Sequence, residues 1–228
     1  MKPLKESFIK AKDLDKIVER KYVLTDETLN LNGHTLYRIK ALKDIPSKKI
    51  KKGDLGGWIE SYDNLDQNGD CWVGNEAKVY DNAWIYNNAK VSGNAQVYDN
   101  AQVYDTAYVY DDAKVYGNAQ VCKNAMIYGF AWVYGNAQVY DFAWVYSDAQ
   151  IRDKAKVYGN TKIYDNAEVY GNAQVYDTAK IYGSVWIYNN AKVYGSAEVF
   201  GGACVYGSAK VCGTAQVSYE VNKGTIEK

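Results

Sequence analysis

The sequence predicts an all-β fold, a left-handed parallel β-helix whose triangular coils each consist of three hexapeptides. A six-residue repeat is the main observation behind this prediction. From Val73 to Val217, every sixth residue is Val or Ile without exception. Four residues after each of these, up to residue 215, stands Ala, except at Thr161 and Val185. Because six residues is not a helical period, the repeat excludes a helical solenoid.

Each unit reads Ala-x-Val-Tyr and ends in a turn-forming pair, as in Val-Tyr-Gly-Asn-Ala-Gln at 115–120. In a strand, Ala and Val share one face, while x and Tyr share the other. Pairs such as Gly-Asn and Asp-Asn tolerate the left-handed backbone of a tight corner. A corner at the end of every hexapeptide closes a triangle after three of them, with Val, Ile and Ala inside. Residues 73–216 therefore make about eight regular coils, stacked about 4.8 Å apart.

The residues before the repeat predict a small cap made of a helix and a β-hairpin. Apolar residues among charges over 8–20 favour an amphipathic helix. Asn32 and Gly33 lie between apolar runs, which is the signal of a two-residue hairpin turn. The basic stretch at 48–52 is interpreted as a solvated loop, with a phosphate-binding patch as the alternative. A solenoid needs its open apolar end covered, and these residues are suited to that task.

This pattern divides the chain into three parts. Residues 1–58 form the helix/hairpin cap and a linker, 59–218 the β-helix with an irregular first coil, and 219–228 a C-terminal tail. Residues 1–54 carry 14 basic and 8 acidic side chains, whereas the remainder carries 13 and 19. This asymmetry is too mild to predict binding to DNA or RNA, and the whole chain is neutral.

Composition excludes several classes of protein. The chain has one histidine, His34, and no run of 18 apolar residues that could cross a membrane. Its first residues lack the apolar core of a signal peptide. Four cysteines without close pairing are typical of a reducing compartment, so we expect a cytoplasmic protein.

The repeat resembles that of the hexapeptide-repeat family, whose left-handed β-helices include many acyltransferases. Tyr after the aliphatic residue departs from that family, in which Gly, Ala or an acid is commoner. A narrower resemblance is to uncharacterised phage and prophage proteins with Val-Tyr-Gly-Asn-Ala repeats. Segments 22–28, 32–39 and 51–61 are similar to the leader of that group. The resemblance implies the fold, a phage or prophage origin and, since many hexapeptide-repeat proteins trimerise, a trimer.

Steps of one full coil assign the outward side chains to three faces. Of the 25 residues that follow the aliphatic position, 18 are Tyr, so stacked coils should carry tyrosine ladders. These ladders are interpreted either as purely structural or as part of an interface or ligand platform. Counting from the face that carries Tyr108 as face one, the next along the chain is face two, with Lys114 and Trp132, and face three, with Gln102, Gln120 and Gln138, is the most polar. Face one carries an apolar block in its middle coils, Tyr108, Tyr110, Met126, Tyr128, Trp144 and Tyr146, which is the best candidate for a subunit interface.

Further candidates extend this set around the prism. Phe130 and Phe142 occupy corners where Asn, Ser or Thr is usual, so each should protrude. Two interpretations stay open: packing against a neighbouring subunit or a ligand, and simple tolerance of Phe at a corner. Trp132 and Tyr134, with Arg152 nearby, could hold a planar anionic ligand on face two. These five residues and the face-one block are the predicted ligand-binding or interface residues.

The sequence shows no catalytic or metal-binding constellation, and we expect no cofactor. No histidine follows His34, so neither the acyltransferase histidine nor a three-histidine zinc site is available. Cys122 and Cys212 share face three but lie five coils apart, beyond disulfide reach. Asp81 and Asp99 stack at one corner, where a solvated corner is the simpler interpretation than a cation site.

These observations favour a non-enzymatic binding or assembly protein of phage or prophage type. Its most concrete form is an oligomer, with a trimer favoured, whose aromatic clefts between subunits hold a small planar or nucleotide-like ligand. Such a protein would act as a sponge against host defence signalling in the host cytoplasm. Two alternatives stay open: a purely structural oligomerisation scaffold, and a divergent acyltransferase that lacks the usual histidine.

Overall fold

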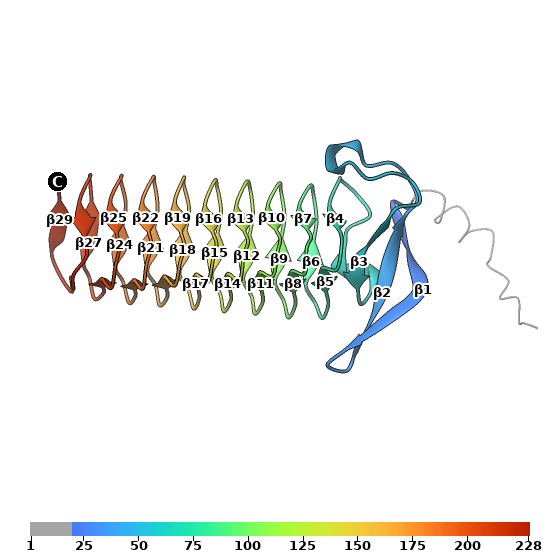
Figure 1. Ribbon diagram of the computed structural model, residues 1–228, viewed down its shortest axis with the longest axis horizontal. Helices are drawn as coiled ribbons and strands as arrows, with labels where there is room; N and C mark the ends of the chain where they lie inside the picture. Colours follow the sequence, from blue (N-terminus) through green and yellow to red (C-terminus); the bar gives the residue numbers. More distant parts are fainter. Residues whose placement is uncertain (1–19) are drawn as a thin grey trace, which may run out of the picture.

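The computed structural model describes residues 20–228. The amphipathic helix expected over 8–20 therefore falls almost entirely outside the described residues. The rest of the chain forms a parallel β-solenoid with a β-hairpin at its N-terminal end (Figure 1). The all-β prediction is thus confirmed. Among residues 20–228, no helix is long and apolar enough to span a membrane.

Three sheets make the faces of the solenoid, and the chain visits them in turn (Figure 1). Face one consists of β4 (Trp72–Val73), β7 (Lys90–Val91), β10 (Tyr108–Val109), β13 (Met126–Ile127), β16 (Trp144–Val145), β19 (Lys162–Ile163), β22 (Lys180–Ile181), β25 (Glu198–Val199) and β28 (Gln216–Val217). Face two continues from the cap through β5 (Lys78–Val79), β8 (Gln96–Val97), β11 (Lys114–Val115), β14 (Trp132–Val133), β17 (Gln150–Ile151), β20 (Glu168–Val169), β23 (Trp186–Ile187) and β26 (Cys204–Val205). Face three consists of β6 (Trp84–Ile85), β9 (Gln102–Val103), β12 (Gln120–Val121), β15 (Gln138–Val139), β18 (Lys156–Val157), β21 (Gln174–Val175), β24 (Lys192–Val193), β27 (Lys210–Cys212) and β29 (Thr225–Glu227).

Neighbouring strands pair in parallel with a register of three hexapeptides, as the repeat predicts. Tyr108 on β10 lies beside Met126 on β13, which lies beside Trp144 on β16. The aliphatic track and the small-residue track point inward and are fully or almost fully buried along the whole solenoid. Since Val and Ile are bulky and Ala is small, the two tracks together fill the triangular interior.

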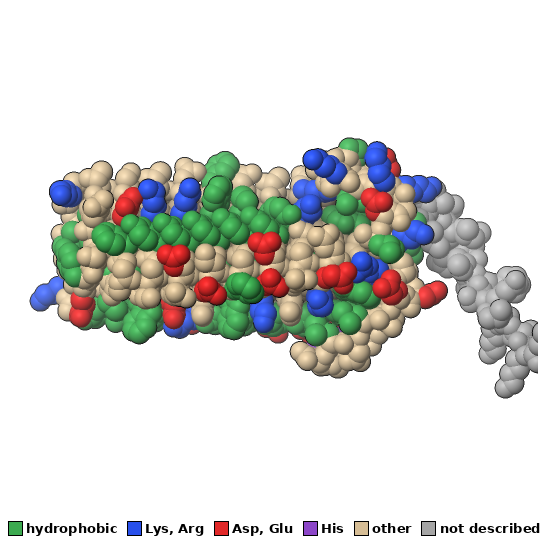
Figure 2. Space-filling model, in the orientation of Figure 1, with side chains coloured by type: hydrophobic (Ala, Val, Ile, Leu, Met, Phe, Trp, Pro, Cys, Tyr) green, Lys and Arg blue, Asp and Glu red, His purple; other side chains and the backbone are tan. Residues whose placement is uncertain are grey.

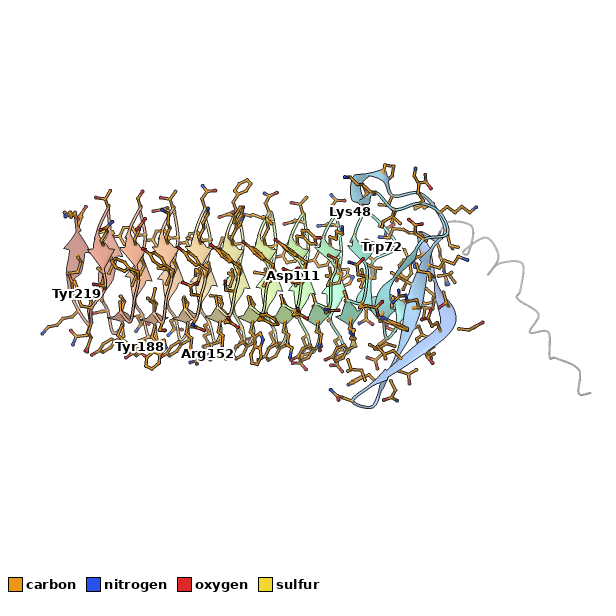
Figure 3. The ribbon with its side chains drawn as sticks, viewed as in Figure 1. Lys48, Trp72, Asp111, Arg152, Tyr188 and Tyr219 are labelled. Atoms are coloured by element: carbon orange, nitrogen blue, oxygen red, sulfur yellow. The ribbon has the colours of Figure 1, made fainter. Side chains whose placement is uncertain are left out.

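Corners are closed by links between coils that the sequence does not reveal directly. The first corner residue has a left-handed backbone, with φ of 57° at Asp99 and 69° at Gly117. Wherever this residue is Asp, its carboxylate accepts a hydrogen bond from the backbone N–H one coil later, as from Gly117 to Asp99 at 3.0 Å. Asp111, labelled in Figure 3, receives the N–H of Gly129 in the same way at 3.3 Å. We call these contacts corner clasps.

The cap joins the solenoid through face two. Strands β1 (Tyr22–Leu31) and β2 (His34–Ala41) form the predicted hairpin around Asn32 and Gly33. Strand β2 pairs antiparallel with β3 (Leu55–Ile59), which pairs in parallel with β5. Two short 3-10 helices, η1 (Pro46–Lys48) and η2 (Tyr62–Asn64), complete the cap. The hairpin therefore extends face two beyond the first coil, at the end of the solenoid shown in Figure 1.

A buried lysine fixes the cap to the irregular first coil. Lys21 is fully buried, and its ammonium donates hydrogen bonds to the carbonyl oxygens of Asn68, Gly69 and Cys71 at 3.3, 3.3 and 2.9 Å. Burial lowers the pKa of Lys21. Beside it, the Tyr22 hydroxyl donates to the Leu65 carbonyl oxygen at 2.6 Å. These bonds satisfy carbonyl groups at the open end of the solenoid, where no preceding coil exists.

At the other end, the last residues add to the stack. Val221 forms a parallel bridge with Val205, and β29 pairs in parallel with β27. The segment that the sequence separates as a tail thus contributes a partial final coil, and Ile226 packs against the core. Tyr219, labelled in Figure 3, is exposed at this end.

Thr161 provides a test of the packing. Its Oγ1 atom is buried and has no protein hydrogen-bond partner. We expect the isosteric change Thr161→Val to raise the free energy of unfolding by about 1 kcal/mol, because it removes an unsatisfied hydroxyl. The thermal midpoint, measured by circular dichroism, should rise by about 2–4 °C.

The matched control is Ala179→Val, one coil later on the same track. That position holds a fully buried Ala, so two added methyl groups should overpack the interior and destabilise by about 1–3 kcal/mol. A lower midpoint for Thr161→Val than for the unchanged protein would contradict the description of the core.

Candidate functional site

The tyrosines that follow the aliphatic residue stack in columns along each face. The longest unbroken column, on face one, runs from Tyr110 to Phe200. Within it, the rings of Tyr110 and Tyr128 are 4.8 Å apart at 7°, and those of Tyr128 and Tyr146 are 4.8 Å apart at 1°. Figure 2 shows the hydrophobic side chains in bands that run along the solenoid.

Inner ladder rings have both faces covered by their neighbours. A third ring inserted between two others needs them about 7 Å apart, since carbon atoms in contact lie about 3.5–4.0 Å from each other. The observed 4.8 Å between Tyr128 and Tyr146 leaves no such space. A planar ligand cannot therefore enter an intact ladder, and the rings offer it only their edges and hydroxyl groups.

Burial in the ladders raises the pKa of several tyrosine hydroxyl groups. Burial is the main cause that raises the pKa of Tyr98, Tyr110, Tyr116 and Tyr146 to about 12, and neighbouring tyrosines and corner aspartates add to it. The phenolate form is disfavoured because a charged oxygen would be partly desolvated beside other negative groups.

The predicted face-one block lies together. Tyr108, Met126 and Trp144 are adjacent along one column by strand register, while Tyr110, Tyr128 and Tyr146 form the ladder beside them. All six are partly buried. The ammonium of Lys90 lies 5.3 Å from the ring centroid of Tyr108, and that of Lys162 lies 4.8 Å from Trp144, so cations border the block at both ends.

The two corner phenylalanines are among the most exposed large apolar residues, at 62% for Phe130 and 57% for Phe142. Phe130 follows the face-one strand β13, and Phe142 precedes the face-one strand β16, which pairs with β13. The two rings therefore stand at opposite edges of face one in adjacent coils. Each also lies two residues before a Trp, in the sequence Phe-Ala-Trp.

A groove of about 590 Å³ runs along the corner between faces one and two, and we call it the corner groove. Phe130 and Trp132 form its aromatic part. The ammonium of Lys114 lies 5.1 Å from the ring centroid of Trp132. Its full lining consists of Lys78, Asn94, Gln96, Asp112, Lys114, Phe130, Trp132, Asp148 and Gln150.

The structure does not place Arg152 and Tyr134 in this groove. Arg152, labelled in Figure 3, occupies a ladder position on face two. Its guanidinium stacks 3.8 Å from the ring centroid of Tyr170. The Arg152 guanidinium also forms an ion pair with Glu168, with 3.2 Å between Nη2 and Oε2. Its charge is therefore partly neutralised by a neighbouring side chain on the same face. The Tyr134 hydroxyl donates to the Gln150 side-chain oxygen at 3.3 Å.

Sequence reasoning missed the polar members of the corner groove. Lys78, Gln96, Lys114 and Gln150 hold the x position on face two in successive coils, with Trp132 interrupting the row. The facing row of second corner residues contains Asn94, Asp112 and Asp148. The spacing alone could have found both rows, because the two positions lie on either side of one inward-pointing Ala.

His34, at the hairpin turn, lies beside two carboxylates of the solenoid, Glu60 and Asp81. Its Nδ1 atom lies 3.0 Å from Glu60 Oε1 and 3.6 Å from Asp81 Oδ1, while Glu60 Oε2 accepts the Asp81 N–H at 2.7 Å. The hydrogen bond to Glu60 raises the pKa of His34. One ligand atom from each residue lies within 4.8 Å of the others, which is compatible with a cation. Their mutual hydrogen bonds already explain the cluster as a junction between hairpin and solenoid.

The four cysteines are free thiols with different settings. Cys122 and Cys212 replace Tyr on face three, and Cys122 interrupts the ladder between Tyr104 and Tyr140. Burial raises the pKa of Cys71 and of Cys122, which disfavours the reactive thiolate at these two positions.

Fold and surface together define the chain as a parallel β-solenoid with aromatic ladders and a corner groove lined by aromatic, basic and acidic side chains. No protein-family model and no curated protein matches the chain.

An alkaline titration tests the ladders. In the folded protein the pKa of Tyr98, Tyr110, Tyr116 and Tyr146 is raised above the ordinary value near 10. Their protonated hydroxyl groups therefore contribute their full stability to the fold below pH 10. Above pH 10 the unfolded chain loses its phenolic protons first, and this stability is lost as the pH rises toward 12.

Absorbance at 295 nm should therefore show a component that ionises near pH 12, due to tyrosines such as Tyr98, Tyr110, Tyr116 and Tyr146, together with loss of the β signal in circular dichroism. In guanidinium chloride the same tyrosines should titrate near 10. A native curve centred at 10 would mean that the ladders are not stacked.

Proposed function

We propose that the chain is a non-enzymatic β-helical binding and assembly protein of phage or prophage type. In this proposal it forms an oligomer, a trimer, through the aromatic face one. Clefts between subunits hold a small planar or nucleotide-like ligand and sequester it from host defence signalling. The origin rests on the resemblance of the Val-Tyr-Gly-Asn-Ala repeats and the leader to phage proteins. A cytoplasmic setting follows from the same proposal.

The exposure of Phe130 and Phe142 is the observation that carries the proposal. Most other corners hold polar residues or Gly, and the ladders satisfy their own ring faces. Two protruding phenylalanines at the edges of one face are therefore unexplained by the solenoid alone. A neighbouring subunit on face one would cover both rings, together with Met126 and Trp144 between them.

The corner groove supplies the ligand part of the proposal. Phe130 and Trp132 offer exposed ring surface, and Trp132 is 37% exposed although the ladder ring of Tyr116 packs against it edge to face. Lys114 and Lys78 line the same groove, beside Asp112 and Asp148, and their ammonium groups can pair with a phosphate group. Because the groove borders face one, a subunit docked there would close it into a cleft. Stacking on aromatic rings and pairing of lysines with phosphate together suit a nucleotide-like molecule.

A purely structural scaffold is the second candidate, and the close stacking of the ladders favours it. Rings 4.8 Å apart bury one another and stabilise each coil against the next without any ligand. In that case the oligomer forms through face one, and the corner groove stays empty.

Light scattering tests the interface. We expect Tyr128→Glu to convert the oligomer to monomers of 25.6 kDa, because it places a charge in the middle of the apolar block. The matched control is Tyr158→Glu, which breaks a ladder in the same way on the polar face three and should leave the oligomer intact. A wild-type protein that is already monomeric would contradict the proposed assembly.

Calorimetry with nucleotides and cyclic dinucleotides tests the ligand. Trp132→Ala should weaken binding about tenfold or more, since stacking on one base contributes about 1–3 kcal/mol. Trp84→Ala removes an exposed Trp on face three, outside the groove, and should leave the affinity unchanged. Absence of binding for the whole set would favour the structural scaffold instead.

A further inference from the structure

A second, basic pocket lies where the cap meets face one. It has a volume of about 300 Å³ and is lined by Ser47, Lys48, Lys49, Lys90, Thr106 and Tyr108. The first three belong to η1 and its end, whereas the last three belong to the second and third coils. Three lysines, two of them far from the third in the sequence, therefore converge on one hollow.

The cap loop that carries two of these lysines is held firmly in place. Ile45 and Ile50 close it through reciprocal backbone hydrogen bonds at 2.9 and 3.2 Å. The Ser47 hydroxyl donates to Asp70 Oδ2 at 2.6 Å, and the Lys48 ammonium donates to the carbonyl oxygen of Asn88. Figure 3 shows Lys48 on the loop beside the first coils. The lysines are thus positioned before any ligand arrives, which lowers the entropic cost of binding.

The positive charge of this pocket is poorly neutralised by the protein. Within residues 20–228, no carboxylate lies within 4.0 Å of the ammonium of Lys48, Lys49 or Lys90. Lys90 instead lies over the ring of Tyr108. Asp70, which accepts a hydrogen bond from Ser47, is a nearby carboxylate whose charge offsets only part of the positive charge at Lys48. Burial, followed by the charge of Lys90, lowers the pKa of Lys48. The fold therefore bears an electrostatic cost that an anion would relieve.

The donors that remain available are ammonium groups. The hydroxyl of Ser47 already donates to Asp70, and that of Thr106 donates to the carbonyl oxygen of Lys123 at 2.7 Å. Lys48 has two further N–H groups besides the one directed at Asn88, and Lys49 and Lys90 add three each. Several ammonium groups around one hollow match a compact dianion with three acceptor oxygens better than a single carboxylate.

We propose that this pocket binds the phosphate group of a small soluble phosphorylated molecule. The phosphate oxygens accept hydrogen bonds from Lys48, Lys49 and Lys90, and the group attached to the phosphate lies along Thr106 and Tyr108. The proposal goes beyond the function proposed above, because the pocket uses no residue of the corner groove, shares only Tyr108 with the face-one block and requires a single subunit.

Calorimetry of the full chain with inorganic phosphate and with pyrophosphate tests the site at constant ionic strength. We expect one saturable site per chain, with pyrophosphate binding more tightly because it carries more charge. Lys49→Gln and Lys90→Gln should each weaken binding about tenfold, equal to about 1.4 kcal/mol. Lys156→Gln, an exposed lysine on face three, is the matched control and should bind as the unchanged protein does. Circular dichroism spectra of the variants, compared with that of the unchanged protein, check that each variant keeps the solenoid.

Three results would overturn the site: no saturable binding of either anion, equal weakening by Lys156→Gln, or binding that Lys49→Gln and Lys90→Gln leave unchanged. Vesicles containing phosphatidic acid provide a further arm, and binding to these without binding to the soluble anions would also contradict the proposal. Trp132→Ala separates the two sites, because it should leave phosphate binding intact whether or not the corner groove binds nucleotides.

Discussion

The register between successive coils is the constraint on which the rest of this structure depends. A slip of one residue would turn every Val and Ile outward and every x residue inward, so the buried tracks fix the register along the whole solenoid. Once it is fixed, each position of the repeat becomes a column. Tyr after the aliphatic residue becomes a ladder, and Asp at the first corner position becomes a row of clasps. A choice of residue in one unit therefore acts on the coils before and after it.

Most of the fold could be predicted from the sequence, because periodicity determines which residues are buried and which share a face. The corner clasps could not, since Asp in a turn is expected simply to face water, and only the stacking distance brings its carboxylate to the next N–H. Lys21 shows the same limit: a lysine is expected to be exposed, yet here it serves carbonyl groups of the first coil. Of the candidate residues, Phe130 and Trp132 line one groove, which the sequence did not predict, while Arg152 stacks on Tyr170 within the ladder. The basic pocket depends on where the non-repeating loop at Lys48 packs against the solenoid, and the spacing of residues in the sequence does not predict that position.

The regular and irregular parts of the surface have different roles. The stacked rings of the ladders cover one another's faces, so they stabilise the coils and leave only their edges and hydroxyl groups for contact with other molecules. Departures from the repeat, such as Phe130 and Phe142 at the corners, are where the surface exposes groups that the solenoid does not use. The loop at Lys48 is a departure of another kind, because it overlies the repeat from outside. In a repetitive protein, the residues that depart from the repeat provide the groups available for recognition, and the regular coils hold them at fixed positions.

The corner clasps also give the solenoid a direction. Each carboxylate accepts from the coil that follows it, so an Asp in the last coil would have no N–H to receive. The first corner residues from Gly195 to Gly213 are all Gly, and the final clasp joins Asp177 to Gly195. The C-terminal coils therefore lack both the clasps and the lower backbone entropy of Asp in the unfolded chain. Since a stack of repeats opens from whichever end is weakest, hydrogen exchange should be graded along the prism, slow beneath the cap and fastest at the glycine end.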